Sequence, residues 1–306
     1  MHNAESVPPL PGPLGRRPVL NVWWRLTRAS QVTMTAVVGV AMGIVGAGGH
    51  LSLTLWARVL FSALLLVGMA YAADLSNMVA DGLREDRVHP TKKNRPIPSG
   101  EVSTERVLSN ATSIFLVEAI LAVYLFTPAY AIALLLVGLT AYIYSMPPRT
   151  KNGLVLNGVG ISLPRSIFGP MAAFLAGSGG FLTSSYWLLL PVSIPLVLLA
   201  GEIRNIEPDA SADRAFGTRT ISNTYGDRAG WALSIGGMVT APLLALSFGL
   251  MGPDPFLWGL LLPPILMGMA YWRAWSHHTT HQIYHLSFMG AILLYALPFI
   301  LRVVVG

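Results

Sequence analysis

Two short segments of this chain carry acidic and amide side chains at helical spacing. The first segment places three such residues at positions i, i+3 and i+7: Asp74, Asn77 and Asp81. The second places four of them at positions i, i+3, i+7 and i+11: Glu202, Asn205, Asp209 and Asp213. Residues at these spacings share one helix face, so each set forms a row of oxygen ligands. Stacked carboxylates repel one another unless a cation neutralises them, and a site without His or Cys favours Mg²⁺ over zinc or copper. Two such helices that face each other could hold a pair of Mg²⁺ ions, which would in turn bind a diphosphate.

Basic residues follow both acidic segments. The string 86–100 reads DRVHPTKKNRPIPSG, and Gly217-Thr218-Arg219-Thr220 follows the second segment. Arginine and lysine bind phosphate oxygens, arginine often through two nitrogens at once. The alternative interpretation is that these are the charges that set membrane topology. That alternative is weakest for Arg95 and Arg219, which lie within motif-like strings.

The elements that position these residues must lie in a membrane. Of the 306 residues, 53% are hydrophobic and only 11% are charged, whereas soluble domains carry about a quarter charged residues. This composition excludes an ordinary cytosolic enzyme, a nucleic-acid-binding protein and a disordered protein. The net charge of +6 comes from short clusters between apolar runs, and the chain has no cysteine for a disulfide, a thiolate nucleophile or a metal ligand.

We therefore predict an all-α integral membrane protein with nine transmembrane helices around a central cavity. Each run is continuously apolar and about 20 residues long, unlike the alternating strands of a barrel. Most Lys and Arg residues fall in the loops on one side, which predicts a cytoplasmic N-terminus and an outer C-terminus. Residues 1–30 are predicted to form a cytoplasmic tail and residues 31–306 a single domain. Pro164 and Gly169-Pro170 are expected to break the fifth span. The spans are 31–48, 55–80, 106–127, 129–146, 154–177, 186–207, 229–250, 256–273 and 283–304.

With these motifs the chain resembles the UbiA-type intramembrane prenyltransferases. Asn77, Asp81 and Arg95-Pro-Ile-Pro-Ser-Gly100 match the family's first aspartate motif and the segment after it. The second motif is matched by Asp209, Asp213, Gly217 and Thr220, and a third feature by Tyr144-Ser-Met-Pro-Pro-Arg-Thr-Lys151. The chain departs from the first motif at Met78, where the family has an aspartate. One extra residue also follows Asp81, so that either Glu85 or Asp86 fills the third acidic position.

The resemblance implies Mg²⁺-dependent transfer of an isoprenyl group from a prenyl diphosphate to an aromatic or quinone-precursor acceptor, a small aromatic or lipid-pathway molecule. Ionisation would give an allylic carbocation that alkylates the acceptor. Two Mg²⁺ ions would be held by oxygen ligands from both motifs: Asn77, Asp81, Glu85 or Asp86, Asn205, Asp209 and Asp213. Catalysis would depend on Asp81, Asp209, Asp213 and Tyr144, although Tyr144 could instead be an interface aromatic. The diphosphate would be bound by basic residues: Arg87, Lys92, Arg95, Lys151 and Arg219.

Other functions remain open from the sequence. A membrane terpene cyclase would ionise the same diphosphate without an acceptor. A phosphoribosyltransferase that acts on a polyprenyl phosphate would explain the Asp86-Arg-Val-His-Pro-Thr-Lys92 string. A transporter would need carboxylates near the bilayer midplane, whereas here they lie at helix ends. We expect a bacterial or archaeal cell membrane, with the site facing the cytoplasm.

Overall fold

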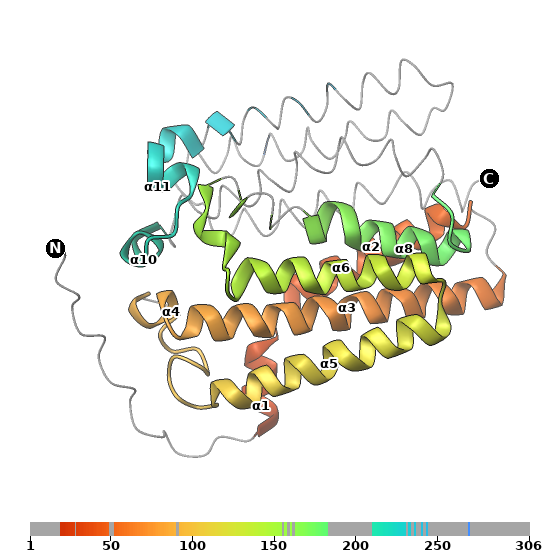
Figure 1. Cartoon of the computed structure of the whole chain (residues 1–306), viewed down its shortest axis with the longest axis horizontal. Helices are drawn as coiled ribbons and strands as arrows, with labels where there is room; N and C mark the ends of the chain where they lie inside the picture. The colour runs from red at the N-terminus through yellow and green to blue at the C-terminus, as the bar shows by residue number, and fades with distance from the viewer. Residues whose placement is uncertain are drawn as a thin grey trace.

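The computed structural model describes residues 19–27, 29–48, 52–89, 92–154, 156–157, 160, 163–182 and 210–230, with isolated positions at 232, 233, 236, 240, 243 and 269. Within these residues the regular structure is entirely helical. Five helices of 10 to 30 residues lie side by side, and the short helices α4 (Glu85–Val88), α10 (Ala210–Ala215) and α11 (Ile221–Tyr225) gather at one end of them (Figure 1).

Helix α3 (Leu53–Gly82) is the centre of this arrangement and also carries the first acidic motif. It packs against α2 (Ala29–Gly46), α5 (Thr104–Leu125), α6 (Pro128–Ser145) and α8 (Gly169–Ser178). Because α3 has neighbours on several sides, the apolar residues on its inner faces are buried from Val59 to Val79, whereas Leu53, Leu60 and Leu64 are exposed. The outward residues of α5 remain apolar and exposed, as expected for a surface that faces lipid.

Hydroxyl caps fix where three of the helices begin. Ser52, Ser103 and Thr127 accept hydrogen bonds from the backbone N–H groups three residues later, at 3.2, 3.3 and 3.4 Å. Each bond satisfies an N–H group that has no partner within its helix. Pro128 follows the last of these caps at a helix start, where its missing N–H costs nothing.

Glycine allows α2 and α8 to approach through their backbones. A Cβ atom on Gly177 would lie 1.9 Å from the carbonyl oxygen of Gly43, and one on Gly46 would lie 2.1 Å from that of Phe174. Small residues at such contacts are typical of helix packing in membranes.

The fifth predicted span is interrupted, as Pro164 and Gly169-Pro170 indicated. A π-helical turn, η2 (Leu163–Phe168), precedes α8. Pro170 has no N–H to continue the helical ladder, and a Cβ on Gly169 would lie 2.8 Å from the Pro164 carbonyl oxygen.

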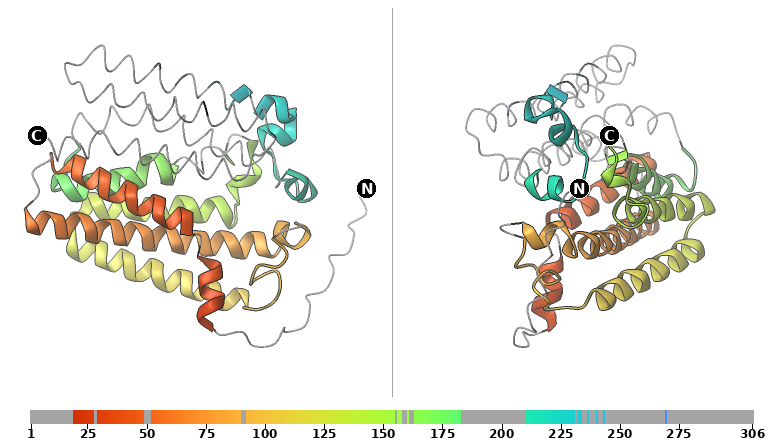
Figure 2. Two further views of the ribbon diagram at one scale, coloured as in Figure 1. Left: turned by 180° about the vertical axis from the view of Figure 1, so that it is seen from behind. Right: turned by 60° about the vertical axis from the view of Figure 1, so that its left-hand side comes forward.

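Helix α1 (Val19–Leu26) occupies part of the predicted tail, where no helix is expected from the sequence. It runs across the direction of α3 and α5 rather than alongside them (Figures 1 and 2). Val22 and Leu26 are buried in one apolar cluster with residues of α3, α5 and the loop between them.

The predicted spans correspond to the structure as far as it is described. Helices α3, α5 and α6 are long and apolar enough to cross a membrane and confirm the second, third and fourth spans, with ends within two residues of those predicted. Helix α2 occupies the first. The spans 186–207 and 283–304, and most of 229–250 and 256–273, lie outside the described residues.

Candidate active site

The first acidic motif lies where α3 ends. The helix is continuous through Asp74, Asn77 and Asp81, as predicted, and stops at Gly82. A Cβ on Gly82 would lie 2.7 Å from Ile97 Cγ2, so glycine lets the following loop pack closely on the helix end. After a turn, the four-residue helix α4 (Glu85–Val88) brings Glu85 back beside Asp81.

Two basic residues from the segment after α6 pair with these carboxylates. Arg149 Nη2 lies 2.6 Å from Glu85 Oε1 and 3.2 Å from Asp81 Oδ1. Lys151 Nζ, from the short helix η1 (Thr150–Asn152), lies 2.5 Å from Asp81 Oδ1 and 3.5 Å from Glu85 Oε1. Glu85, Arg149 and Lys151 are buried and Asp81 is half-buried, so two negative and two positive charges balance one another away from solvent.

The balance of charges is visible in the pKa of the Lys151 ammonium. Burial by itself lowers this pKa, and the neighbouring Arg149 acts in the same direction. The carboxylates of Asp81 and Glu85 outweigh both, so the pKa is raised above its ordinary value. Lys151 is therefore a permanent cation at neutral pH.

The backbone conformation of Arg149 directs its side chain toward Asp81 and Glu85. Its φ and ψ angles of 55° and 67° lie in the left-handed region, the only such case among the described non-glycine residues. Its Nη1 also donates to the carbonyl oxygens of Ala80 and Ser145, at 3.4 and 3.5 Å. The guanidinium thus connects the ends of α3 and α6 as well as the two carboxylates.

The loop after the second acidic motif closes over the same cluster. Thr218 Oγ1 lies 3.3 Å from both Glu85 Oε1 and Asn152 Oδ1. Beside it, Arg84 donates to the Phe216 carbonyl at 3.1 Å and stacks over the Phe216 ring. Residues more than 130 positions apart therefore meet at this end of the helices.

Asp86 belongs to a different contact from Glu85. It is buried, and its Oδ2 accepts a hydrogen bond from Arg95 Nη1 at 3.0 Å. Arg95 is about one-third exposed. The two candidates for the third acidic position therefore point to different basic residues: Glu85 lies with Asp81, and Asp86 lies with the Arg95 segment.

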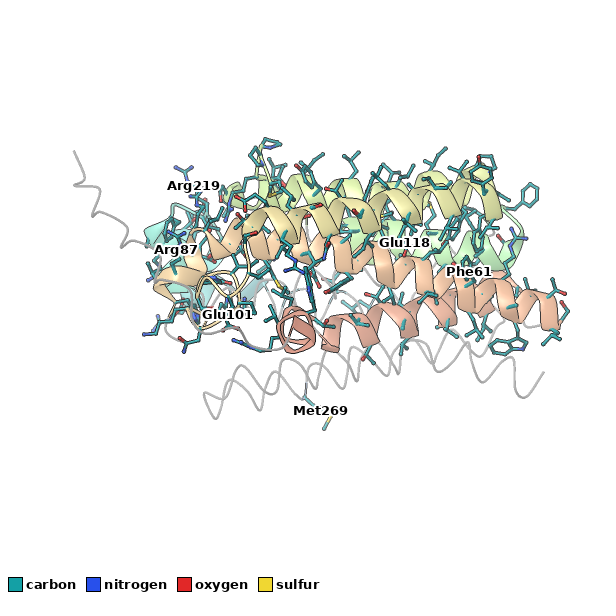
Figure 3. The ribbon with its side chains drawn as sticks, turned by 90° about the horizontal axis from the view of Figure 1, so that it is seen from below. Phe61, Arg87, Glu101, Glu118, Arg219 and Met269 are labelled. Atoms are coloured by element: carbon teal, nitrogen blue, oxygen red, sulfur yellow. The ribbon has the colours of Figure 1, made fainter. Side chains whose placement is uncertain are left out.

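The other predicted site residues fall into three groups. Tyr144, Arg87, Lys92 and Asp213 are half-buried, and Arg87 Nε is buried without a partner among the described residues. Arg219 is exposed, and it lies with Arg87 and Glu101 at one end of the helices, with Phe61 at the other (Figure 3). Asn205 and Asp209 lie outside the described residues, whereas Asp213 is in α10 (Ala210–Ala215).

Arg149 and Thr218 belong to the site but are not among the residues predicted for it from the sequence. Arg149 directly follows the Tyr-Ser-Met-Pro-Pro string, and Thr218 lies between the matched Gly217 and Thr220. Their positions within matched motifs were the available signal. A loop arginine looks like a topology charge, however, and a threonine has no distinctive pattern.

The donor set fits a hard divalent cation. Asn77, Asp81 and Glu85 offer amide and carboxylate oxygens, and Glu85 Oε2 is buried with no hydrogen-bond partner in the described part of the chain. Ser145 Oγ fixes the amide of Asn77 by donating to its Oδ1 at 3.0 Å. Within the described residues, no three His, Asp or Glu side chains converge on one point.

Proteins of known activity are similar to this chain in sequence. A digeranylgeranylglyceryl phosphate synthase of Natronomonas pharaonis is 31% identical over 226 residues, which are 72% of this chain and 78% of the synthase. A protoheme IX farnesyltransferase of Leptospira biflexa is 28% identical over 162 residues, covering 52% of this chain and 54% of that enzyme.

Solved structures share the fold. A UbiA homologue from Archaeoglobus fulgidus bound to GPP and Mg²⁺ superimposes with a TM-score of 0.73 and 15% identity, over 92% of this chain and 99% of its own. The apo structure of a UbiA homologue from Aeropyrum pernix gives 0.73 and 19%, over 90% and 98%. The model of the UbiA prenyltransferase family matches residues 32–293. Apolar membrane helices, the motifs at their ends and these matches together show that the chain is an integral membrane protein that belongs to the UbiA prenyltransferase family.

Proposed function

We propose that this protein transfers an isoprenyl group from a prenyl diphosphate to a lipid-pathway acceptor, with Mg²⁺ as cofactor. One observation carries the proposal. Asp81, half-buried at the end of a membrane-spanning helix, and the buried Glu85 of α4 pair with Arg149 and Lys151. A diphosphate needs both cations and metal-binding carboxylates around it, and the site joins them to apolar helices that suit an isoprenoid tail.

Asn77, Asp81 and Glu85 would hold Mg²⁺ from the first motif, and Asn205, Asp209 and Asp213 from the second. We assign Glu85 rather than Asp86 because Glu85 lies with Asp81 and keeps one buried oxygen without a partner. Two ions are expected, one for each motif. When bound, Mg²⁺ would offset the charge that develops on the departing diphosphate.

The basic residues have two roles in this proposal. Arg149 and Lys151 orient the carboxylates and add positive charge beside them. Arg95 and the less buried cations would contact the outer phosphate oxygens: Arg87, Lys92 and Arg219. Tyr144 contributes to the raised pKa of Lys151 by a charge interaction, and it would donate a hydrogen bond to the same diphosphate.

The reaction breaks the bond between the allylic carbon and the bridging oxygen. The diphosphate leaves with the electron pair, and the preorganised cationic side chains stabilise the negative charge that develops on the bridging oxygen more than they stabilise the intact ester. Buried helices exclude water, which would otherwise capture the carbocation. The acceptor then forms the new bond to this carbon and releases a proton to solvent or diphosphate.

The acceptor class has two candidates. The motifs resemble those of enzymes with aromatic or quinone-precursor acceptors. The Natronomonas relative, by its name, instead forms digeranylgeranylglyceryl phosphate, which favours a glyceryl phosphate lipid as the second candidate. By the distribution of Lys and Arg, the site faces the cytoplasm, and we expect the membrane to be that of a bacterial or archaeal cell.

Diphosphate release by the purified protein tests the proposal. Mg²⁺ and a panel of prenyl diphosphates would be combined with aromatic acids, with geranylgeranylglyceryl phosphate or with protoheme. We expect release that depends on Mg²⁺ and on one acceptor. It should fall at least about a hundredfold in Asp81→Asn and Glu85→Gln, as for loss of groups that act on the transition state. The exposed Asp227→Asn is the matched control.

Other outcomes identify the alternatives. Release without acceptor, with a cyclic product, would show a terpene cyclase. Transfer of phosphoribose to a polyprenyl phosphate would show the phosphoribosyltransferase. Ion or solute flux that requires Asp81, without turnover of any prenyl diphosphate, would replace the proposal with a transporter.

A further inference from the structure

Helix α1 lies outside both acidic motifs, yet it packs beside the first of them. Val22 and Leu26 are buried in a cluster with Val79, which lies on α3 two residues before Asp81. The same cluster includes Ile97 from the loop between α4 and α5. One face of α1 therefore contacts both the end of α3 and the loop that carries Arg95.

Arg25 links α1 to the two ends of the segment 94–101. Its Nη1 lies 2.6 and 2.9 Å from the two carboxylate oxygens of Glu101, and its Nη2 donates to the Asn94 carbonyl at 2.7 Å. The Glu101 side chain is only 7% exposed and that of Arg25 is 28% exposed. A charged contact that is short and partly desolvated holds geometry better than a surface pair.

Inside this segment, a short path leads from Glu101 to Arg95. Ser99 Oγ lies 3.3 Å from Glu101 Oε1 and donates to the Arg95 carbonyl at 2.7 Å. Gly100 closes the turn with a φ of 76°, a conformation that other residues rarely adopt. The Arg95 side chain then reaches Asp86 at 3.0 Å.

We propose that Arg25 is a positioning residue for the prenyl diphosphate. By fixing Asn94 and Glu101, α1 holds the Arg95 guanidinium at the site end of α3, where it binds the diphosphate of the donor. This inference rests on the proposed function, because it assigns Arg95 to that ligand. Arg25 itself touches no reacting group and acts through the loop.

Enzyme kinetics with Arg25→Gln provide the first test. Loss of the link lets Arg95 leave its position, so we expect the KM for the prenyl diphosphate to rise about tenfold, with a smaller fall in kcat. A role in folding alone would reduce the amount of active enzyme, which lowers the apparent kcat and leaves KM unchanged. Glu101→Gln should reproduce the effect, and the exchange of Arg25→Glu with Glu101→Arg should recover part of it. Arg106→Gln, an exposed arginine just after the loop, is the matched control.

Limited proteolysis measures how readily the loop between α4 and α5 opens, and it requires no substrate. Trypsin would cleave after the exposed Lys93, which lies within the loop next to Asn94. Because cleavage follows the population of opened loop, we expect about tenfold faster cleavage there in Arg25→Gln and Glu101→Gln but not in Arg106→Gln.

Each outcome decides one question. Cleavage rates equal to wild type in both variants, or an unchanged KM despite faster cleavage, would overturn the positioning role. Absence of donor turnover in the wild type would overturn the proposed function, and the cleavage rates would still decide whether Arg25 fixes the loop.

Discussion

Removing the Arg149 guanidinium should destabilise the protein and strengthen its affinity for Mg²⁺. Arg149 is buried beside two carboxylates, with its side chain 9% exposed. An ion pair at about 4 Å near a protein surface is worth about 4 kcal/mol in Coulomb energy. The variant no longer has to bury a charged guanidinium, and the desolvation free energy saved in this way offsets part of that loss. Lys151 also still neutralises one of the two negative charges. We therefore expect Arg149→Gln to cost about 2–3 kcal/mol, below the range for a buried charge left without any partner.

The backbone at Arg149 allows the charge to be separated from the conformation. A non-glycine residue in the left-handed region costs about 1 kcal/mol, and Arg149→Gln retains that cost. Arg149→Gly loses the same charge but relieves the conformation, so it should be about 1 kcal/mol more stable than Arg149→Gln. Arg228→Gln, at an exposed arginine, is the control for removal of a positive charge.

The assay is thermal unfolding of the purified protein in detergent over a series of Mg²⁺ concentrations. Without Mg²⁺, a loss of 2–3 kcal/mol should lower the Tm of Arg149→Gln by about 5 °C. Because we propose that the same carboxylates bind Mg²⁺, the variant should recover stability at about tenfold lower Mg²⁺ than the wild type needs for its own shift. A Tm equal to wild type without Mg²⁺ would refute the burial argument. Recovery that persists in Arg149→Gln combined with Asp81→Asn would refute the shared site.

Three further changes, the first with a matched control substitution, test the packing and the site. Gly177→Ala places a Cβ against a backbone carbonyl of α2 that cannot move aside, and should lower stability by about 2 kcal/mol in a thermal melt. Gly236→Ala, at an exposed helical position where a Cβ would meet nothing within 4 Å among the described residues, should instead raise stability by up to about 1 kcal/mol, because alanine favours a helix over glycine, and an equal loss in both would contradict the close contact. Thr218→Val removes the hydroxyl beside Glu85 and should raise the KM for the donor a fewfold, for a loss of about 1 kcal/mol, with steady-state kinetics as the measure. Lys151→Met should cost about 2 kcal/mol in melts at any pH from 6 to 9. The pKa of Lys151 is higher in the folded protein than in the unfolded chain, so its contribution to stability is complete below about pH 10.4. That contribution is lost only as the pH rises through the folded pKa. A cost of Lys151→Met that fades between pH 6 and 9 would therefore exclude the ion pairs.

The sequence determined the membrane class, the helices and the residue types of the site. Continuous apolar runs can satisfy their backbone groups in lipid only as helices, so the positions of α3, α5 and α6 follow from hydropathy within two residues. The spacing of Asp74, Asn77 and Asp81 placed them correctly on one helix, because that helix is uninterrupted. Proline and glycine marked the break before α8 for equally local reasons.

The tertiary structure decided which charges meet. Helical spacing would extend the row from Asp81 to Glu85 in any case, but α3 ends at Gly82, and Glu85 reaches Asp81 because α4 turns back. Arg149 and Thr218 come from segments 68 and 137 positions away from Asp81, and no periodicity in the sequence connects them. Helix α1 is too short to register as an element by itself and is stabilised by its contacts with the loop. The pattern of residues within one segment predicts the secondary structure of that segment. Pairing between side chains that are distant in the sequence depends on how the helices pack, and that packing assembles the site.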